Sequence, residues 1–270
     1  MSHDLTGKII IITGASSGIG AATAVACARA GMDTVLNARR ANALAETAER
    51  VRQYGRTAEL VVGDVTDEGM SARLLDAATE KYGRFDVVFA NAGYGFSRPM
   101  HEMDEPALRR IFEVNFFAAN NLVCAAARRL LAAKQRGHLL MCSSCVAKFT
   151  MPEFAAYSAT KAAQNHVCRA MRMELRRHRI HVSSVHPITT HTDFFAVSAQ
   201  LSGRSPEAAN PAQRVPRWFL QTPEQVARAI VSCLRRPRPE VWTSTPMRIV
   251  AGLMTIFPRL MDLTARVGPR

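Results

Sequence analysis

The sequence has 270 residues, of which 48% are hydrophobic and 21% are charged, and these fractions exclude a disordered or fibrous chain. Lys and Arg number 35 against 22 Asp and Glu, which gives a net charge of +13. This excess predicts an anionic partner but does not choose between nucleic acid, anionic lipid and a phosphorylated small molecule.

Short apolar segments alternate with longer amphipathic segments along most of the chain. We expect strands at 9–13, 34–38, 58–62, 87–90, 138–142, 182–185 and 241–243. Helical patterns lie between them at 41–54, 67–82, 104–134 and 155–177, and another helix begins at Thr222 and Pro223. This alternation predicts a doubly wound, Rossmann-type α/β fold, in which helices cover both faces of a parallel sheet of about seven strands.

The pattern also predicts the domain organisation. Residues 1–245 form a single domain, and residues 246–270 form a C-terminal helical extension that is apolar and basic. After Pro187 the alternation stops, and residues 188–221 carry three prolines among small polar residues. A loop of this length is typical of a functional lid, so we expect it to cover the substrate.

The first strand leads into a glycine-rich turn. Residues 9–28 contain no charged side chain and follow Lys8, as in an export signal, but Gly14, Gly18 and Gly20 interrupt them. We therefore interpret the segment as a strand, a turn and a helix. Small residues let the turn approach a pyrophosphate, which the N–H groups at the helix start would bind. The G-x-x-x-G-x-G spacing differs from the familiar G-x-G-x-x-G.

The end of the second strand indicates which dinucleotide is bound. NAD sites place an acidic residue there to bind the ribose hydroxyls. Here Asn37 and Ala38 are followed by Arg39 and Arg40, with no acid. Because a guanidinium can pair with a 2′-phosphate, the pattern favours NADP(H). The alternative is a solvated basic start of the next helix.

The six cysteines are scattered, which is typical of reduced thiols in the core of an intracellular protein. Cys142 and Cys145 have C-x-x-C spacing. A redox pair is possible on that spacing, but we favour a coincidence at the end of a strand.

Tyr157 and Lys161 are four residues apart in a helical pattern, so they share one helix face. A nearby ammonium favours the phenolate and would lower the tyrosine pKa from about 10. The pair alone could be ordinary surface chemistry. Its context is more specific, because Ser143 and Ser144 end a buried strand upstream and the run 91–93, Asn-Ala-Gly, ends the strand before that.

These ordered motifs, from about Lys8 to Thr243, resemble the short-chain dehydrogenase/reductase family. The resemblance implies that Ser144 would hydrogen-bond the substrate oxygen and Tyr157 would transfer its proton. Lys161 would lower the Tyr157 pKa and bind the nicotinamide ribose, while Asn115 would hold a relay water. The implied cofactor contacts are Gly14, Ser16, Ser17, Gly18, Ile19, Gly20, Arg39, Arg40, Asp64, Val65, Asn91, Ala92, Gly93, Tyr157, Lys161, Pro187, Ile188 and Thr192.

Within that set, Asp64 would contact the adenine and Thr192 the nicotinamide carboxamide. Three features depart from the family pattern. Ile188 stands where the family usually has glycine, His186 and His191 make the surrounding loop less typical, and the chain continues for some 25 residues past the last strand. These departures concern the substrate and the assembly, since no catalytic group is missing.

Aromatic and methionine residues cluster in three segments expected near the nicotinamide: Tyr94, Phe96 and Met100; Phe149, Met151 and Phe154; Phe194, Phe195, Trp218 and Phe219. They predict a hydrophobic ketone, aldehyde or alcohol as substrate, with ordinary lid packing as the alternative. The function predicted is NADP(H)-dependent oxidoreduction. A non-catalytic dinucleotide-binding scaffold and a membrane-surface protein are the rivals.

The apolar segment 246–261 has arginines near its ends and is too short for a comfortable membrane span. We expect subunit or intramolecular packing first, and contact with a membrane surface second. No histidine has metal-ligand spacing and no nucleic-acid-binding module is present, so neither a metal nor a nucleic acid is proposed. The expected location is cytoplasmic, with membrane association as an alternative, and the resemblance implies a homodimer or homotetramer.

Overall fold

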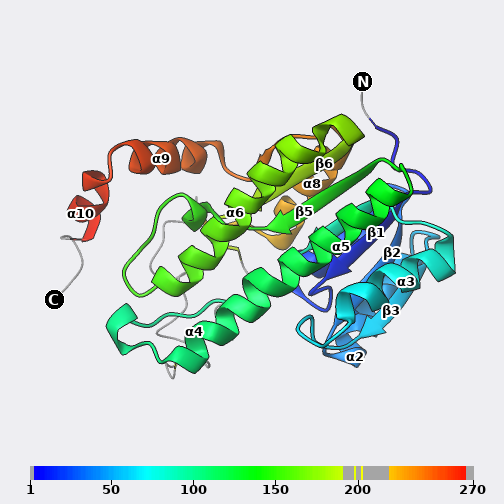
Figure 1. Ribbon diagram of the computed structural model, residues 1–270, viewed down its shortest axis with the longest axis horizontal. Coiled ribbons are helices and arrows are strands. Elements are labelled where there is room, and N and C mark those ends of the chain that lie inside the picture. Colours follow the sequence, from blue (N-terminus) through cyan, green and yellow to red (C-terminus); the bar gives the residue numbers. More distant parts are fainter. Residues whose placement is uncertain (1–2, 191–197, 199–201, 203–218, 266–270) are drawn as a thin grey trace.

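The computed structural model describes residues 3–190, 198, 202 and 219–265. Within them, one parallel sheet of seven strands has the order β3-β2-β1-β4-β5-β6-β7 (Figure 1). Its strands are β1 (Ile9–Thr13), β2 (Asp33–Ala38), β3 (Ala58–Val62), β4 (Val87–Ala90), β5 (Gly137–Cys142), β6 (Ile180–His186) and β7 (Glu240–Trp242). The predicted Rossmann-type fold is confirmed, and the strand order reverses between β1 and β4, where α/β proteins bind ligands.

Helices cover both faces of the sheet. The main ones are α1 (Gly18–Arg29), α2 (Ala41–Arg52), α3 (Met70–Tyr82), α4 (Glu105–Phe112), α5 (Ala118–Ala132), α6 (Ala155–Leu175), α8 (Pro223–Arg235), α9 (Thr245–Ile256) and α10 (Arg259–Ala265). Short 3-10 turns are η1 (Met100–Glu102), η3 (Cys145–Ala147) and η4 (Arg176–His178). At the start of α8, Thr222 and Gln225 form the capping box that accompanies the predicted Thr-Pro start.

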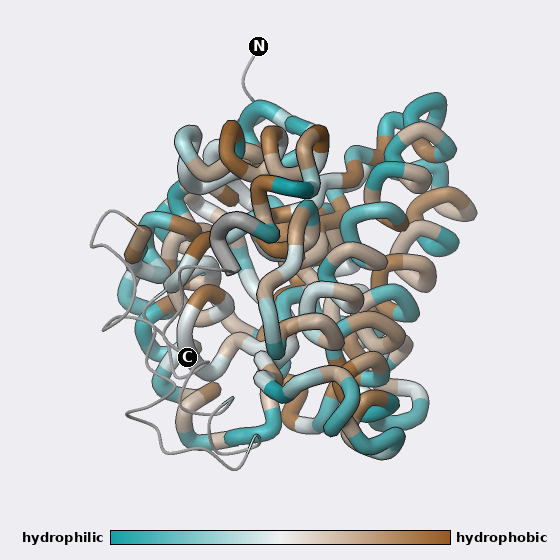
Figure 2. Tube along the Cα trace, turned by 90° about the vertical axis from the view of Figure 1, so that its left-hand side faces the viewer, coloured by the Kyte–Doolittle hydropathy of each residue, from teal (hydrophilic) through white to brown (hydrophobic). Residues whose placement is uncertain are grey.

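The core has two layers because successive strand residues point to opposite faces. Ile10 and Ile12 of β1 pack with α1, α2 and α8, whereas Ile11 packs with α3, α5 and α6. All three isoleucines are fully buried, as the unbroken apolar run of a central parallel strand requires. On the outer helices, hydrophobic and hydrophilic residues alternate along the trace (Figure 2).

The predicted helix 104–134 is divided in the structure. Between α4 and α5, residues Glu113–Phe117 form a π-helical turn, η2. Asn115, a predicted catalytic residue, lies in this turn and is fully buried. Hydrophobic periodicity continues through the insertion, so the sequence pattern did not reveal it. Such π-turns occur frequently at functional sites.

Other differences lie at element ends. α3 begins at Met70 rather than at 67, because Gly69 adopts a left-handed conformation with φ of 73° just before it. β6 extends to Ile180 and His186, beyond the predicted 182–185. Most of the predicted lid 188–221, including Thr192, lies outside the described residues. Among the described helices, none is long and apolar enough to cross a membrane.

Candidate active site

The glycine-rich turn lies between the carboxyl ends of β1 and β4. Gly14 and Gly18 have φ of 66° and 55°, which is the left-handed region that glycine tolerates. A Cβ on Gly20 would lie 2.1 Å from the Gly14 carbonyl oxygen and 2.7 Å from Nδ2 of Asn91. The Ser17 side chain does not cap α1. The N–H groups of the first turn of α1 therefore remain available for an anion, and only glycine permits so close an approach.

Asn91 fixes this turn to the next strand. Its Nδ2 donates to the carbonyl oxygens of Thr13 at 3.0 Å and Gly14 at 3.3 Å. The Thr13 hydroxyl accepts from the N–H groups of Asn91 at 3.0 Å and Ala92 at 3.1 Å. Thr13 was not among the predicted site residues, because a threonine at a strand end has no distinctive sequence signal.

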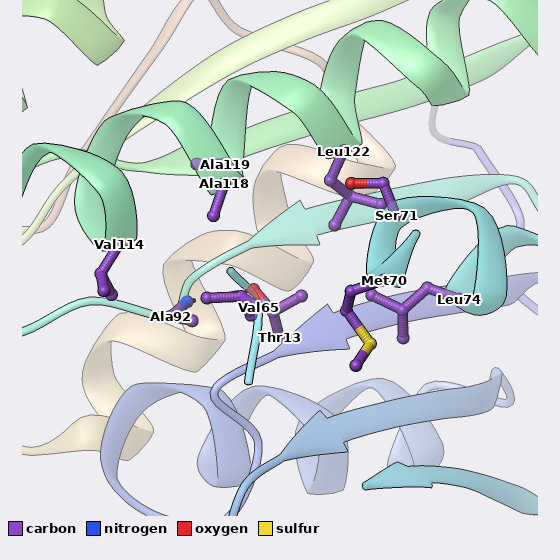
Figure 3. A pocket seen from close by; sticks show the side chains of 10 residues that line it. All are labelled: Thr13, Val65, Met70, Ser71, Leu74, Ala92, Val114, Ala118, Ala119 and Leu122. Atoms are coloured by element: carbon purple, nitrogen blue, oxygen red, sulfur yellow. Dashed lines mark hydrogen bonds between the residues drawn. The ribbon is translucent and has the colours of Figure 1, made fainter. Parts of the chain in front are cut away.

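A pocket opens beside these strand ends. Figure 3 shows Val65 and Ala92, both predicted cofactor contacts, close to Thr13, with Met70 and Leu74 of α3 farther along. The complete lining is Thr13, Val65, Met70, Ser71, Leu74, Ala92, Val114, Ala118, Ala119 and Leu122. Ile19, another predicted cofactor contact, is partly buried and packs its side chain against the core.

The end of β2 carries a cluster of arginines around the glycine-rich turn. Arg40 Nη2 donates to the hydroxyls of Ser17 at 3.0 Å and Ser16 at 3.4 Å. The Asp64 carboxylate lies 3.8 Å from a guanidinium nitrogen of Arg39 and 3.0 Å from one of Arg110. Arg110 comes from α4, far away in sequence, and was not predicted.

These charges hold Asp64 ionised. Burial acts to raise the Asp64 pKa, but hydrogen bonds from Thr66 and the charges of Arg110 and Arg39 outweigh it, and the pKa lies below its usual value. Asn37, the last polar residue of β2 before the arginines, is fully buried and donates to the Val61 carbonyl at 2.9 Å. It supports the sheet and does not face a ribose.

The catalytic candidates lie together at the carboxyl end of β5 and the start of α6. Tyr157 and Lys161 are both buried, and the Lys161 ammonium is 5.5 Å from the centre of the Tyr157 ring. The Ser144 hydroxyl, at the start of η3, hydrogen-bonds the Tyr157 phenol. The structure thus brings together three of the four predicted catalytic side chains, and Asn115 approaches them from η2.

Electrostatics in this cluster is dominated by burial. Burial raises the Tyr157 pKa above its usual value, and the hydrogen bond with Ser144 opposes this only in part. Burial likewise lowers the Lys161 pKa. The sequence-based expectation of a lowered tyrosine pKa is therefore not met in the protein alone, where the phenol stays protonated.

Lys161 and Asn115 are held by neighbouring groups. Lys161 Nζ donates to the Cys142 carbonyl at 2.7 Å and to Oε1 of Gln164 at 3.4 Å. The Asn115 side chain exchanges hydrogen bonds with the backbone of Tyr94, both at 2.9 Å. A Cβ on Gly93 would lie 3.0 Å from Asn115 Oδ1 and 3.5 Å from Lys161 Nζ, so Gly93 leaves space beside both groups.

Residues at the end of β6 contact the backbone of Ser144 and Cys145. The His186 ring is fully buried, stacks on Trp242 at 4.6 Å between centres, and bonds the Ser144 carbonyl through Nδ1 at 2.9 Å. Pro187 accepts from the Cys145 N–H at 3.0 Å. Ile188 is buried and is not in the left-handed conformation, so the backbone accommodates this side chain in place of the family's glycine.

The aromatic segments converge in part. Phe96 is buried in one cluster with Tyr157, and Tyr94, Phe149 and Phe154 pack against it. Met100 and Met151 are exposed to 48% and 42% instead. Phe194, Phe195 and Trp218 lie outside the described residues.

Cys142 and Cys145 are free thiols. Burial raises the pKa of Cys145 to about 11 and also raises that of Cys142, which is opposite to the activation expected of a redox pair. Among the described residues, no group of three or more His, Cys, Asp or Glu side chains could hold a metal ion.

Comparison with known proteins assigns the family. The family model for short chain dehydrogenases matches residues 8–201 of this chain. The chain belongs to the short-chain dehydrogenase/reductase family. It is an oxidoreductase of this family, and the resemblance inferred from its sequence motifs is confirmed.

Curated relatives of this dehydrogenase/reductase include two of different length. The A-factor type gamma-butyrolactone 1'-reductase (1S-forming) of Streptomyces virginiae is 32% identical over 246 residues, or 91% of this chain and 86% of that protein. Glycine betaine reductase ATRR of Emericella nidulans is 33% identical over 233 residues, but the match covers 86% of this chain and only 18% of that protein.

Solved members of the family have the same fold. A Burkholderia phymatum short-chain dehydrogenase/reductase in complex with NAD has a TM-score of 0.85 at 24% identity and covers 99% of this chain and 98% of its own. An alcohol dehydrogenase from Thermococcus sibiricus, complexed with 5-hydroxy-NADP, has a TM-score of 0.73 at 27% identity and covers 87% and 95%. Structural neighbours thus bind nicotinamide dinucleotides of both kinds.

Proposed function

We propose that this short-chain dehydrogenase/reductase uses NADP(H) to interconvert a hydrophobic ketone or aldehyde and its alcohol. The observation that carries the proposal is the buried cluster in which the Ser144 hydroxyl meets the Tyr157 phenol beside the Lys161 ammonium. Both hydroxyls can donate to one substrate oxygen, where negative charge develops as a carbonyl accepts hydride.

The cofactor preference rests on the arginine cluster. Arg40 reaches the two serines of the glycine-rich turn, and Arg39 extends from the end of β2 with its side chain 74% exposed. A 2′-phosphate beside the turn would meet these guanidinium groups, whereas no carboxylate at the end of β2 offers an acceptor to ribose hydroxyls. Gly14, Gly18 and Gly20 fit the pyrophosphate, because the turn has no room for a Cβ at Gly20.

The residues of the protein bind the substrate and transfer the proton. The nicotinamide supplies or accepts the hydride when it is bound. Ser144 and Tyr157 orient the substrate oxygen, and Tyr157 transfers the proton from its hydroxyl. The Tyr157 phenol is protonated at neutral pH, since burial raises its pKa above the ordinary value of about 10, and the neutral phenol is the form that donates a proton. At neutral pH the protonated phenol suits carbonyl reduction, which consumes a proton, and oxidation of the alcohol, which releases one, would be favoured at higher pH.

The substrate class rests on the aromatic cluster around Tyr157. Phe96 is 5% exposed, and Tyr94, Phe149 and Phe154 pack against the same cluster. An apolar carbonyl substrate would contact these rings without leaving its own polar groups unpaired. The Streptomyces relative is named as a gamma-butyrolactone reductase, which supports a reductive reaction and leaves the substrate of this chain a proposal.

The function is tested by following NADPH absorbance with a panel of lipophilic ketones and aldehydes. We expect turnover that is lost in Tyr157→Phe while NADPH still binds. Full activity in that variant would reject Tyr157 as the proton donor. Binding of NADPH without turnover of any panel member would favour the dinucleotide-binding scaffold instead.

The C-terminal extension suggests a membrane surface as a further partner. Figure 1 shows α9 and α10 projecting from the body of the domain. Met247 and Ala251 of α9 are buried, while Ile249, Leu253 and Ile256 lie at helical spacing on its exposed side. The exposed apolar side chains form a stripe that continues past the end of α9 into α10, with exposed fractions from 40 to 68%. The stripe consists of Ile249, Leu253, Ile256, Phe257 and Leu260.

Charge favours an anionic lipid surface over a second copy of the chain as the occupant. Residues 246–270 contain four arginines and one aspartate, which would attract anionic headgroups. A second copy docked on this surface would bring the same four arginines to it. We therefore propose that this stripe binds the surface of an anionic membrane. The predicted homodimer or homotetramer would then use another face, and it stays a prediction, as does the cytoplasmic location.

Vesicle flotation tests this surface. The protein should float with vesicles of phosphatidylcholine containing phosphatidylglycerol, should not float with phosphatidylcholine alone, and should lose binding in the double variant Leu253→Glu, Ile256→Glu. If instead the same variant abolishes a dimer measured by light scattering, and vesicles never bind, the stripe is a subunit interface.

A further inference from the structure

One buried side chain beside the catalytic lysine has no role in the sequence analysis. Gln164 is fully buried and lies three residues after Lys161 on α6. Its Oε1 is 3.4 Å from the Lys161 ammonium nitrogen, and its Nε2 donates to the Asn115 carbonyl oxygen at 2.5 Å. A single amide therefore connects the catalytic lysine to the π-helical turn η2.

The position of Gln164 on its helix explains how this bridge arises. Tyr157, Lys161 and Gln164 occur at spacings of four and three, so α6 presents them on one face toward β5 and η2. A polar residue on a fully buried helix face is costly unless its groups are paired. Both ends of the Gln164 amide have partners here, and each partner belongs to the proposed catalytic set.

The bridge also satisfies groups that would otherwise lose partners. The Asn115 carbonyl lies in the π-helical turn η2 and accepts from the Gln164 amide, which gives this backbone group a side-chain partner. The buried Lys161 ammonium has the Cys142 carbonyl as its other hydrogen-bond acceptor among the described residues. Without Oε1 of Gln164, the Lys161 ammonium would keep only its hydrogen bond to the Cys142 carbonyl among these two acceptors.

We propose that Gln164 is a positioning residue that holds Lys161 in its charged form and ties it to η2. The inference rests on the catalytic role proposed for Lys161. The resemblance to the family implied a relay water on Asn115, whereas here an amide of this chain occupies the Asn115 carbonyl. An amide is neither an acid nor a base at neutral pH, so it anchors the ammonium but does not pass protons to it.

The proposal predicts opposite effects for two substitutions. Gln164→Met keeps the length of the side chain but removes the acceptor, so the Lys161 pKa should fall by about one unit, as expected for one hydrogen bond to a charged group. Gln164→Glu keeps an acceptor and adds a negative charge, so the Lys161 pKa should rise. The fall in Gln164→Met is the decisive result, because a residue that only fills space would leave the Lys161 pKa unchanged, whereas any nearby carboxylate would raise it.

The measurement is NMR titration of protein labelled with 13C at the lysine Cε atoms. The chain has five lysines, and the resonance of Lys161 is identified by its loss in Lys161→Arg. Gln135→Met, at an exposed glutamine, is the matched control and should leave the titration unchanged. If Gln164→Met fails to fold, Gln164→Leu, which also removes the acceptor, takes its place, and the same fall in the Lys161 pKa is expected.

The result needs neither substrate nor cofactor, so it is independent of the proposed reaction. An unchanged Lys161 titration in the Gln164 variants, or shifts of the same sign in both, would overturn the bridge. An absence of turnover in the carbonyl panel would instead contradict the proposed function and leave the bridge standing.

Discussion

The two halves of the candidate site are built in different ways. Around Lys161 the polar groups are buried, and each is hydrogen-bonded to another member of the same cluster. Arg39 and Arg40 have exposed side chains, and Arg40 contacts the glycine-rich turn while Arg39 lies beside Asp64. Buried networks respond to substitution as a unit, whereas exposed charges can be changed separately. Catalysis and cofactor preference should therefore be separable by mutation.

The largest effect is expected in the buried half. Tyr157→Phe removes the proton donor but keeps the ring in its cluster, so the rate of carbonyl reduction should fall by about 10³-fold. Thermal denaturation should show a folded protein, and NADPH titration should show affinity near that of the wild type. A loss of NADPH binding equal to the loss of rate would place Tyr157 in cofactor binding rather than in proton transfer.

The glycine-rich turn lies between the two halves and should affect both dinucleotides equally. Gly20→Ala adds a Cβ that would lie 2.1 Å from the Gly14 carbonyl, so the turn must shift and affinity for NADPH and NADH should fall together, by about a hundredfold. Gly252→Ala, where a Cβ meets nothing within 4 Å, is the matched control. Equal affinities in the two variants, measured by cofactor fluorescence, would exclude the turn from the binding site.

Substitutions in the exposed half, around Arg39 and Arg40, should change only the preference for NADPH over NADH. Arg40→Ala should weaken NADPH by about tenfold, the value of one charged hydrogen bond, and leave NADH unchanged. Arg52→Ala removes a surface arginine that pairs with Glu49 at the other end of α2, and it should change neither. If Arg40→Ala weakens both cofactors alike, the arginine supports the turn and does not select the 2′-phosphate.

The smallest effect concerns stability and lies beyond both halves. Burial lowers the His138 pKa to about 3, so the neutral ring is favoured in the folded state and stability is lost as pH falls below about 6.5. Between pH 6.5 and 5 this costs about 2 kcal/mol, or about 4–8 °C in Tm. The Tm of His138→Gln, measured by thermal denaturation at a series of pH values, should fall less than that of the wild type between pH 6.5 and 5. His101→Gln, at an exposed histidine, should follow the wild type.

Local features of the fold and of the site could be predicted from the sequence. Strands such as β1 and β3 matched their predicted bounds, because apolar runs and turn residues act locally. The motif residues Gly20 and Asn91 come together because parallel strands end at one edge of the sheet.

Contacts between distant segments could not be predicted in the same way. Arg110 reaches Asp64 from α4, and Gln164 reaches Asn115 through a π-turn that hydrophobic periodicity does not reveal. The one local signal for Gln164 was a polar residue on the buried face of α6. The effect of burial on Tyr157 was also missed, because a Tyr-Lys spacing gives the nearby charge but not the loss of solvent.

Hydride transfer itself is the most direct test of the proposed chemistry. The protein would be incubated with NADPH deuterated at the transferred position of C4 and with the most reactive carbonyl of the panel, and the alcohol analysed by mass spectrometry. We predict deuterium on the carbinol carbon with the wild type and almost no product with Tyr157→Phe. Alcohol formed without deuterium, or equal yields from both proteins, would contradict this account.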